Sequence, residues 1–105
     1  MSRFAGYTQG LIEFKIDEVN CRIKPQLNDI DEALRILAKA KLENIIPILE
    51  IKKLCRRLLW DALEHEEKDD VAKRELEEFV TIRLLQIWFE IQVAFKLIER
   101  KNVEE

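Results

Sequence analysis

The single histidine is the first place in this sequence to look for chemistry. His65 follows Asp61 by four residues, so the two side chains share one face if the segment is helical. An aspartate and a histidine at this spacing supply half of the four ligands of a zinc site. No second histidine completes the set, and the cysteines, Cys21 and Cys55, lie apart in apolar segments where we expect buried thiols. The sequence therefore predicts no metal site and no cofactor.

Other catalytic patterns are also missing from the sequence. The glycines are Gly6 and Gly10, so no glycine-rich loop is present for a phosphate. The one serine, Ser2, lies outside any recognisable setting of a catalytic triad. Arg83 and Glu90 interrupt an apolar segment and could line a polar pocket, although charges there also suit ion pairs at an interface. We predict no catalytic residues, no small-molecule substrate and a non-enzymatic function.

A basic cluster forms a candidate nucleic-acid-binding face, and its members are Lys52, Lys53, Arg56, Arg57 and Trp60. The cations are spaced i, i+4 in two pairs, so a helix places them in neighbouring rows. Fixed cations bind phosphates, and an aromatic ring beside them can stack on a base or a cation. An acidic stretch follows at once, with six acidic residues against one lysine over residues 61–70. Nucleic-acid binding is therefore the alternative function, secondary to binding of a protein.

Composition indicates that helices position these residues. The chain has 105 residues with two glycines, two prolines, one serine and two threonines, which is too few turn-forming residues for a β-sandwich or barrel. We expect one domain, residues 1–105, with frayed ends at residues 1–10 and 102–105. The predicted fold is all-α, a bundle of three or four helices with a long C-terminal helix.

Charge and hydropathy bear on location and source. The net charge of −3 argues against a histone-like coat on nucleic acid. No apolar stretch typical of a signal peptide follows the N-terminus. The most apolar window, residues 79–98, carries three charged residues, and such residues cost about 2.5–3.5 kcal/mol each near the centre of a bilayer. The sequence therefore predicts a cytoplasmic protein with no membrane partner, and its abundant Glu, Lys and Ile fit an archaeal or thermophilic source.

The segment of residues 10–24 fits two patterns. The apolar residues that recur along one helical face are Ile12, Ile16, Val19 and Ile23. Residues 12–17 also alternate between apolar and charged, as in a strand. We favour a helix, because no glycine or Asn-Gly pair marks a hairpin turn. A short β-hairpin over residues 11–23 is the alternative.

Three further helices are expected after Pro25, which ends the first element. Asn28 is predicted to cap the second helix, whose buried stripe includes Ile30, Leu34, Leu37 and Ile45. Pro47 fits the first turn of a third helix or a kink in a continuous one, with a buried face that comprises Ile48, Ile51, Cys55, Leu58 and Ala62. After a loop at residues 66–70, Asp69 or Asp70 caps a last helix over residues 71–101.

The last helix is predicted to bind a protein. Its apolar residues fill more than one face, and a helix that is apolar on most sides must be covered on most sides. Either the rest of the chain wraps around it or a homodimer or another protein partner covers the surplus, and we favour the partner. The candidate interface residues are Phe79, Leu84, Ile87, Trp88, Phe89, Ile91, Phe95 and Ile98.

Residues 72–87 resemble the long helix of the archaeal GINS subunits of the DNA-replication machinery. The likeness rests on an acid-rich, apolar lead followed by the run Arg83-Leu84-Leu85-Gln86-Ile87, in which Gln86 stands where the family usually has lysine. The resemblance implies a helical, non-catalytic scaffold subunit of a replicative helicase assembly, with Arg83 and Ile87 as packing residues. This expectation agrees with the more general one of a small accessory subunit that self-associates or docks on a partner.

Overall fold

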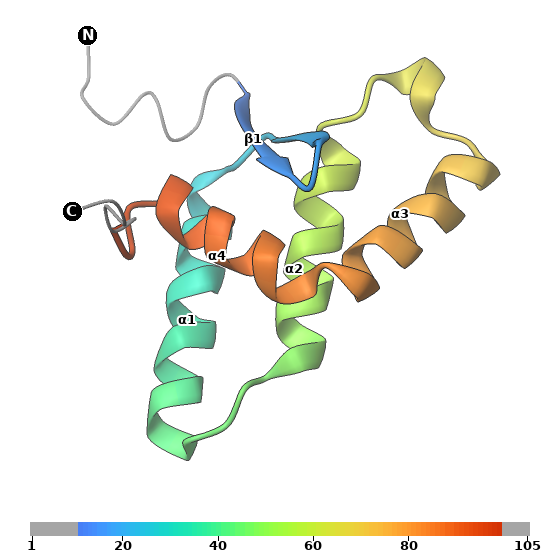
Figure 1. Cartoon of the computed structure of the whole chain (residues 1–105). Helices are drawn as coiled ribbons and strands as arrows, with labels where there is room; N and C mark the ends of the chain where they lie inside the picture. Colours follow the sequence, from blue (N-terminus) through green and yellow to red (C-terminus); the bar gives the residue numbers. More distant parts are fainter. Residues whose placement is uncertain (1–10, 100–105) are drawn as a thin grey trace, which may run out of the picture.

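The computed structural model describes residues 11–99, and this part of the chain is mostly helical with one small sheet (Figure 1). The elements are β1 (Ile12–Ile16), β2 (Val19–Ile23), α1 (Leu27–Glu43), α2 (Ile48–Asp61), the 3₁₀ turn η2 (His65–Glu67), α3 (Asp70–Ile82) and α4 (Leu84–Ala94). The mostly helical prediction is confirmed, and the two strands form the short hairpin that the sequence left as an alternative. The expected frayed ends, residues 1–10 and 102–105, lie outside the described residues.

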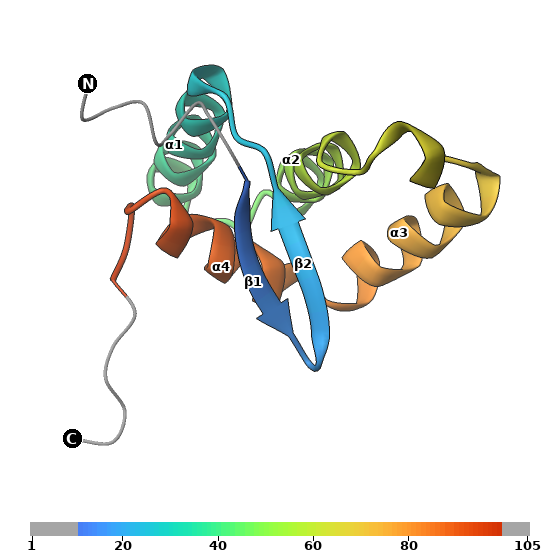
Figure 2. The same cartoon turned by 90° about the horizontal axis from the view of Figure 1, so that it is seen from above.

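Helix α2 is the centre of the arrangement, because it contacts α1, α3, α4 and β2. Helices α1 and α2 lie side by side as an antiparallel pair joined by a turn at one end of the molecule (Figures 1 and 2). Helix α4 crosses this pair, and the hairpin lies at the end away from the turn (Figure 1). Helix α3 leads back from η2 to the start of α4. Each of the other described α-helices and strands therefore contacts α2 or α4.

The predicted helix over residues 10–24 is wrong, and the alternative hairpin is correct. Strands β1 and β2 pair antiparallel, with Ile16 opposite Val19. The turn between them is made by Asp17 and Glu18, whose φ angles of 47° and 73° are both left-handed. Two successive left-handed residues give the turn that best matches the twist of a hairpin, and it ordinarily contains Asn-Gly or Asp-Gly. The turn is not recognisable from the sequence, because Glu18 occupies the position where glycine is usual.

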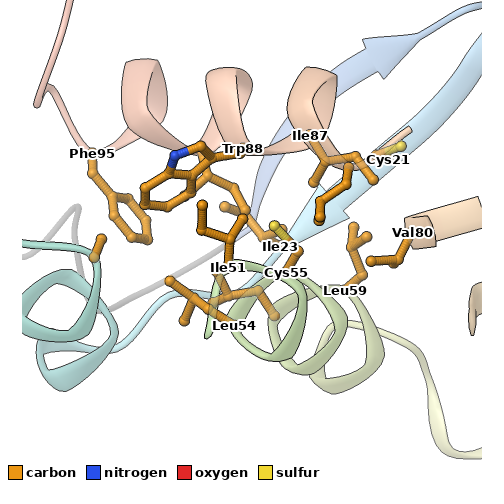
Figure 3. Close-up of a cluster of buried hydrophobic side chains, with 14 of the residues drawn as sticks. Cys21, Ile23, Ile51, Leu54, Cys55, Leu59, Val80, Ile87, Trp88 and Phe95 are labelled. Atoms are coloured by element: carbon orange, nitrogen blue, oxygen red, sulfur yellow. The ribbon is translucent and has the colours of Figure 1, made fainter. Parts of the chain in front are cut away.

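The core lies between α2 and the elements around it (Figure 3). The 3, 4 spacing predicted for the buried face of α2 is confirmed for Ile51, Cys55, Leu58 and Ala62, each of which is buried. Helix α4 contributes Ile87 and Ile91, and the hairpin contributes Ile23; all three are fully buried. One apolar cluster therefore joins the hairpin and the helices.

The predicted long C-terminal helix is wrong, because the chain bends at Arg83. The N–H of Arg83 donates to Phe79 O and closes α3, and its carbonyl accepts from the N–H of Ile87 and opens α4. Thr81 Oγ1 donates to the carbonyl of Glu77 at 2.8 Å, a contact that bends helices. The last helix then ends at Ala94 rather than near residue 101. No helix in the described part of the chain has the length and apolar character needed to cross a membrane.

The start of α1 is fixed by a buried carboxylate rather than by the predicted cap, Asn28. Gln26 is the N-cap, and Asp29 accepts a hydrogen bond from the Gln26 N–H at 2.8 Å. The other oxygen of Asp29 accepts from Arg57 of α2. Asp29 therefore both caps α1 and ties it to α2. The cap predicted for α3 is confirmed, because Asp69 accepts from the N–H of Ala72 at 2.7 Å.

We expect Glu18→Gly to stabilise the protein. A left-handed conformation costs a non-glycine residue roughly 1–2 kcal/mol, and glycine adopts it without this cost. Glycine also has more conformational entropy in the unfolded chain, and this offsets part of the gain. We therefore expect the free energy of unfolding to rise by up to about 1 kcal/mol. Urea unfolding followed by circular dichroism measures it. Lys24→Gly, outside the turn, is the control that should not stabilise, and a loss of stability in Glu18→Gly would contradict this account of the turn.

Candidate interaction surfaces

Most of the predicted interface of the last helix is buried by the chain itself. Leu84, Ile87, Trp88, Ile91 and Phe95 are each at most 8% exposed. The bend at the start of α4 lets α2 cover one side of this helix and β1 another. In this structure these five side chains are core residues of the chain itself.

The other three predicted interface residues have some exposure. Phe79 and Ile98 are half-buried, and Phe89 is 37% exposed. Ile98 lies beyond the end of α4, so it does not continue the packing seam of a helix. Of the eight predicted residues, Phe89 is the most exposed in the described structure, and it does not make a docking surface by itself.

The predicted nucleic-acid-binding face is largely paired within the chain. Lys52 Nζ and Arg56 Nη1 both contact the carboxylate of Glu77 on α3, at 2.8 and 2.9 Å. Arg57 pairs with the buried carboxylate of Asp29. These three cations are each held by a carboxylate, so fewer of them are available to phosphates than the sequence suggests.

The remaining two residues of this face differ from each other. Trp60 stacks with Lys68, whose Nζ lies 5.8 Å from the ring centroid and which is not part of the predicted face. Lys53 is exposed and has no ion pair among the residues that the structure describes. Contact of this face with nucleic acid stays a prediction.

The residues considered for catalysis or metal binding do not gather into a site. Asp61 ends α2 and His65 begins η2, so the two share no helix face. Within residues 11–99, no group of three or more His, Cys, Asp or Glu side chains could hold a metal ion. Arg83 Nε contacts Asp17 of the hairpin turn at 2.8 Å, and both side chains are partly exposed. Arg83 therefore connects the bend to the hairpin turn and does not line a closed polar pocket.

Both cysteines are buried free thiols, as the sequence predicts. Burial raises the pKa of the Cys55 thiol to about 12. Burial, with a smaller effect of the nearby Glu90 charge, raises the pKa of the Cys21 thiol to about 11. Because the thiolate is the reactive form, both residues are protonated and unreactive near neutral pH.

The structure exposes an apolar surface that the sequence reading missed. We call it the apolar turn, and it comprises Leu42 (86% exposed), Ile45 (47%), Ile46 (61%), Ile48 (43%) and Leu49 (80%). Ile45 and Ile48 were expected in buried stripes, but they lie where α1 ends and α2 begins, beyond the reach of α4 and the hairpin. The sequence does contain a signal for this surface: large aliphatic residues flank Pro47 on both sides, where a turn ordinarily carries polar residues.

Comparisons of this chain with protein-family models, with curated proteins and with solved structures find no match. The resemblance of residues 72–87 to the GINS subunits therefore stays a prediction. In the structure this segment spans most of α3 and the first turn of α4, with the bend at Arg83 inside it.

We expect Trp88→Ala to lower the stability of the monomer by about 3–5 kcal/mol, because it empties a large buried volume. Phe89→Ala should cost about 1 kcal/mol or less, because Phe89 is partly exposed and leaves no closed cavity. Chemical unfolding at one low protein concentration measures both changes. Equal losses in the two variants would contradict the core position of Trp88.

The ion pairs of Glu77 make stability depend on pH. Hydrogen bonds first from Lys52 and then from Arg56 hold the pKa of the Glu77 carboxyl below its ordinary value of 4.5. The unfolded chain then binds the proton more readily, so this contribution is present above about pH 4.5 and is lost as the pH falls through the lowered pKa. Glu77→Gln should flatten the acid side of a plot of urea midpoint against pH. Glu78→Gln, at an exposed neighbour, should keep the slope of the wild type, and parallel curves for wild type and Glu77→Gln would refute the coupling.

Proposed function

We propose that this protein is a non-enzymatic interaction protein that self-associates through the apolar turn. The observation that carries the proposal is the exposure of five large aliphatic side chains within residues 42–49. They lie at the end of the α1–α2 pair, away from the hairpin and α4 (Figure 1). Large apolar side chains that are exposed together in one short segment, rather than scattered singly, indicate a site of association.

Symmetry favours a second copy of the chain as the occupant. In a two-fold interface each residue is used twice, so five aliphatic side chains on each copy place ten in contact. Complete burial of one such side chain contributes about 1.5–3 kcal/mol, whereas association costs about 4–15 kcal/mol. Burial of five partly exposed side chains contributes too little free energy to offset the cost of association, whereas burial of ten can exceed it. We expect a dimer with a dissociation constant in the micromolar range.

The charges around the apolar turn support the same occupant. Lys41 and Glu43 are exposed at the end of α1, and Lys53 is exposed one helical turn after Leu49. A border that carries both signs can match its own copy, because a lysine of one protomer can face a glutamate of the other. A strongly acidic or basic partner would find no complementary field here.

The other functions suggested by the sequence gain less support. Docking through the last helix would have to use residues that the chain already buries, such as Trp88. Binding of nucleic acid would have to compete with Glu77 and Asp29 for three of the four cations. A scaffold role of the kind that the GINS resemblance implies is compatible with self-association, and it would use the apolar turn rather than residues 72–87.

The test is the solution mass of the double variant Leu42→Glu/Leu49→Glu. We expect the wild type to change from monomer to dimer with rising concentration in light scattering, and the variant to stay monomeric over the same range. The two positions are 86% and 80% exposed, so the variant should keep the circular dichroism spectrum and the stability of the wild-type monomer. Val71→Glu, at a 53% exposed position on α3, is the matched control and should still dimerise.

Two results would overturn the proposal. One is a wild-type protein that stays monomeric up to millimolar concentration. The other is a double variant that dimerises as the wild type does, because a contact elsewhere on the surface would then hold the dimer.

A further inference from the structure

A groove lies between strand β2 and helix α3. It has a volume of about 750 Å³, within the range of ligand and peptide pockets. One wall is four successive residues of β2, Val19 to Arg22, and the other is one face of α3, which comprises Ala72, Glu75, Leu76 and Phe79. Leu59 and Leu63, from the end of α2 and just after it, also line the groove. Figure 2 shows that β2, rather than β1, is the strand on the α3 side of the hairpin.

The wall formed by β2 is a free sheet edge. The sheet has two strands, and the two-residue turn makes Ile16 and Val19 a hydrogen-bonded pair. Alternation along the ladder then makes Phe14–Cys21 the next bonded pair. The backbone N–H and C=O groups of Asn20 and Arg22 consequently point away from β1. In the described part of the chain no third strand pairs with them.

The two faces of this edge differ in chemistry. Val19 and Cys21 lie on the inner face of the hairpin, beside the leucines of the groove. Arg22 and its cross-strand partner Glu13 lie on the outer face, where Glu67 pairs with Arg22 at 2.8 Å. Glu75 adds a third carboxylate from α3. The groove is thus apolar on its inner side, and its charged lining is three glutamates, one of them paired with Arg22, against that single arginine.

We propose that this groove binds an extended peptide segment of a partner protein, with alternating apolar and basic residues, as a third strand on β2. The backbone of the peptide would pair with Asn20 and Arg22, a mode of recognition that uses an exposed sheet edge beside a helix. Alternate side chains of a strand point to opposite faces, so apolar residues enter the groove while lysines or arginines meet the glutamates. This inference is independent of self-association through the apolar turn.

Two other occupants fit the groove less well. An amphipathic helix satisfies its own backbone groups and would leave those of Asn20 and Arg22 unpaired. A second copy of the chain would bring its own β2, but pairing of the two β2 edges would press the α3 that flanks each edge against the hairpin of the other copy. An extended segment without a flanking helix avoids both conflicts.

A designed peptide tests the proposal. The probe is the eight-residue peptide of alternating valine and lysine with both ends blocked, titrated into isotope-labelled full-length protein and followed by amide NMR shifts. We expect saturable binding with a dissociation constant of about 10–500 μM. The affinity is modest because a short peptide loses conformational entropy on binding and makes only a few contacts that offset this loss. The largest shifts should fall on residues 19–22 and on the groove face of α3.

Two further peptides separate strand addition from charge attraction. N-methylation of the valine amides in one peptide and of the lysine amides in another removes alternate N–H donors. Only one of these sets faces β2, so one of the two peptides should lose at least tenfold in affinity. The peptide of alternating valine and glutamate should not bind. Equal affinity of the unmodified and both methylated peptides would overturn the proposed strand pairing.

Variants of the chain complete the test. Glu75→Lys reverses a charge on the groove face of α3, and we expect roughly a fivefold or greater loss of affinity. Glu78→Lys makes the same change on α3 outside the groove and should bind like the wild type. Equal affinities for the two variants, or shifts centred on another surface, would refute the site. Leu42→Glu/Leu49→Glu should bind the peptide normally, so failure of the groove and failure of self-association give different results.

Discussion

The burial of α4 against α2 is the interaction on which the other contacts of the chain depend. Ile87 and Ile91 are fully buried, and they meet a face of α2 in which Ile51, Leu54 and Leu58 are also buried. A helix as apolar as α4 requires cover on several sides, and α2 can supply only one of them. The hairpin supplies another through β1. The small sheet thus covers part of the core, and it depends on this packing because an isolated two-stranded hairpin is at best marginally stable.

The bend at Arg83 follows from the same requirement. A straight helix through α3 and α4 would carry one of the two away from α2, whereas the bend brings Val80 and Ile87 into one core. Arg83 connects the bend to the hairpin turn through Asp17, and Glu77 connects α3 to α2 through Lys52 and Arg56. These ion pairs are exposed and contribute little energy individually. They fix how α3 is oriented, and this orientation leaves the groove open beside β2.

The sequence predicts those parts of the fold that depend on local patterns. The spacing of Ile51, Cys55 and Leu58 identifies the buried face of α2, and Asp69 identifies the start of α3, because both signals lie within a few residues. The hairpin turn and the bend were missed because neither contains the usual glycine or proline: Glu18 occupies a left-handed position, and the apolar spacing runs through Arg83 without interruption. The pairing of the basic face with Glu77 and Asp29 depends on how distant helices pack, which no local pattern reveals.

The two proposed surfaces are compatible because they lie at different ends of the molecule. The apolar turn is at the foot of the α1–α2 pair, and the groove is beside the hairpin (Figures 1 and 2). A dimer formed through the apolar turn would therefore leave both grooves open. Two weak peptide sites on one dimer bind a partner with repeated segments far more tightly than one site does, because the second binding event is intramolecular. Self-association thus provides a physical reason for a small domain to keep a shallow groove of modest affinity, since the dimer supplies the avidity that one groove lacks.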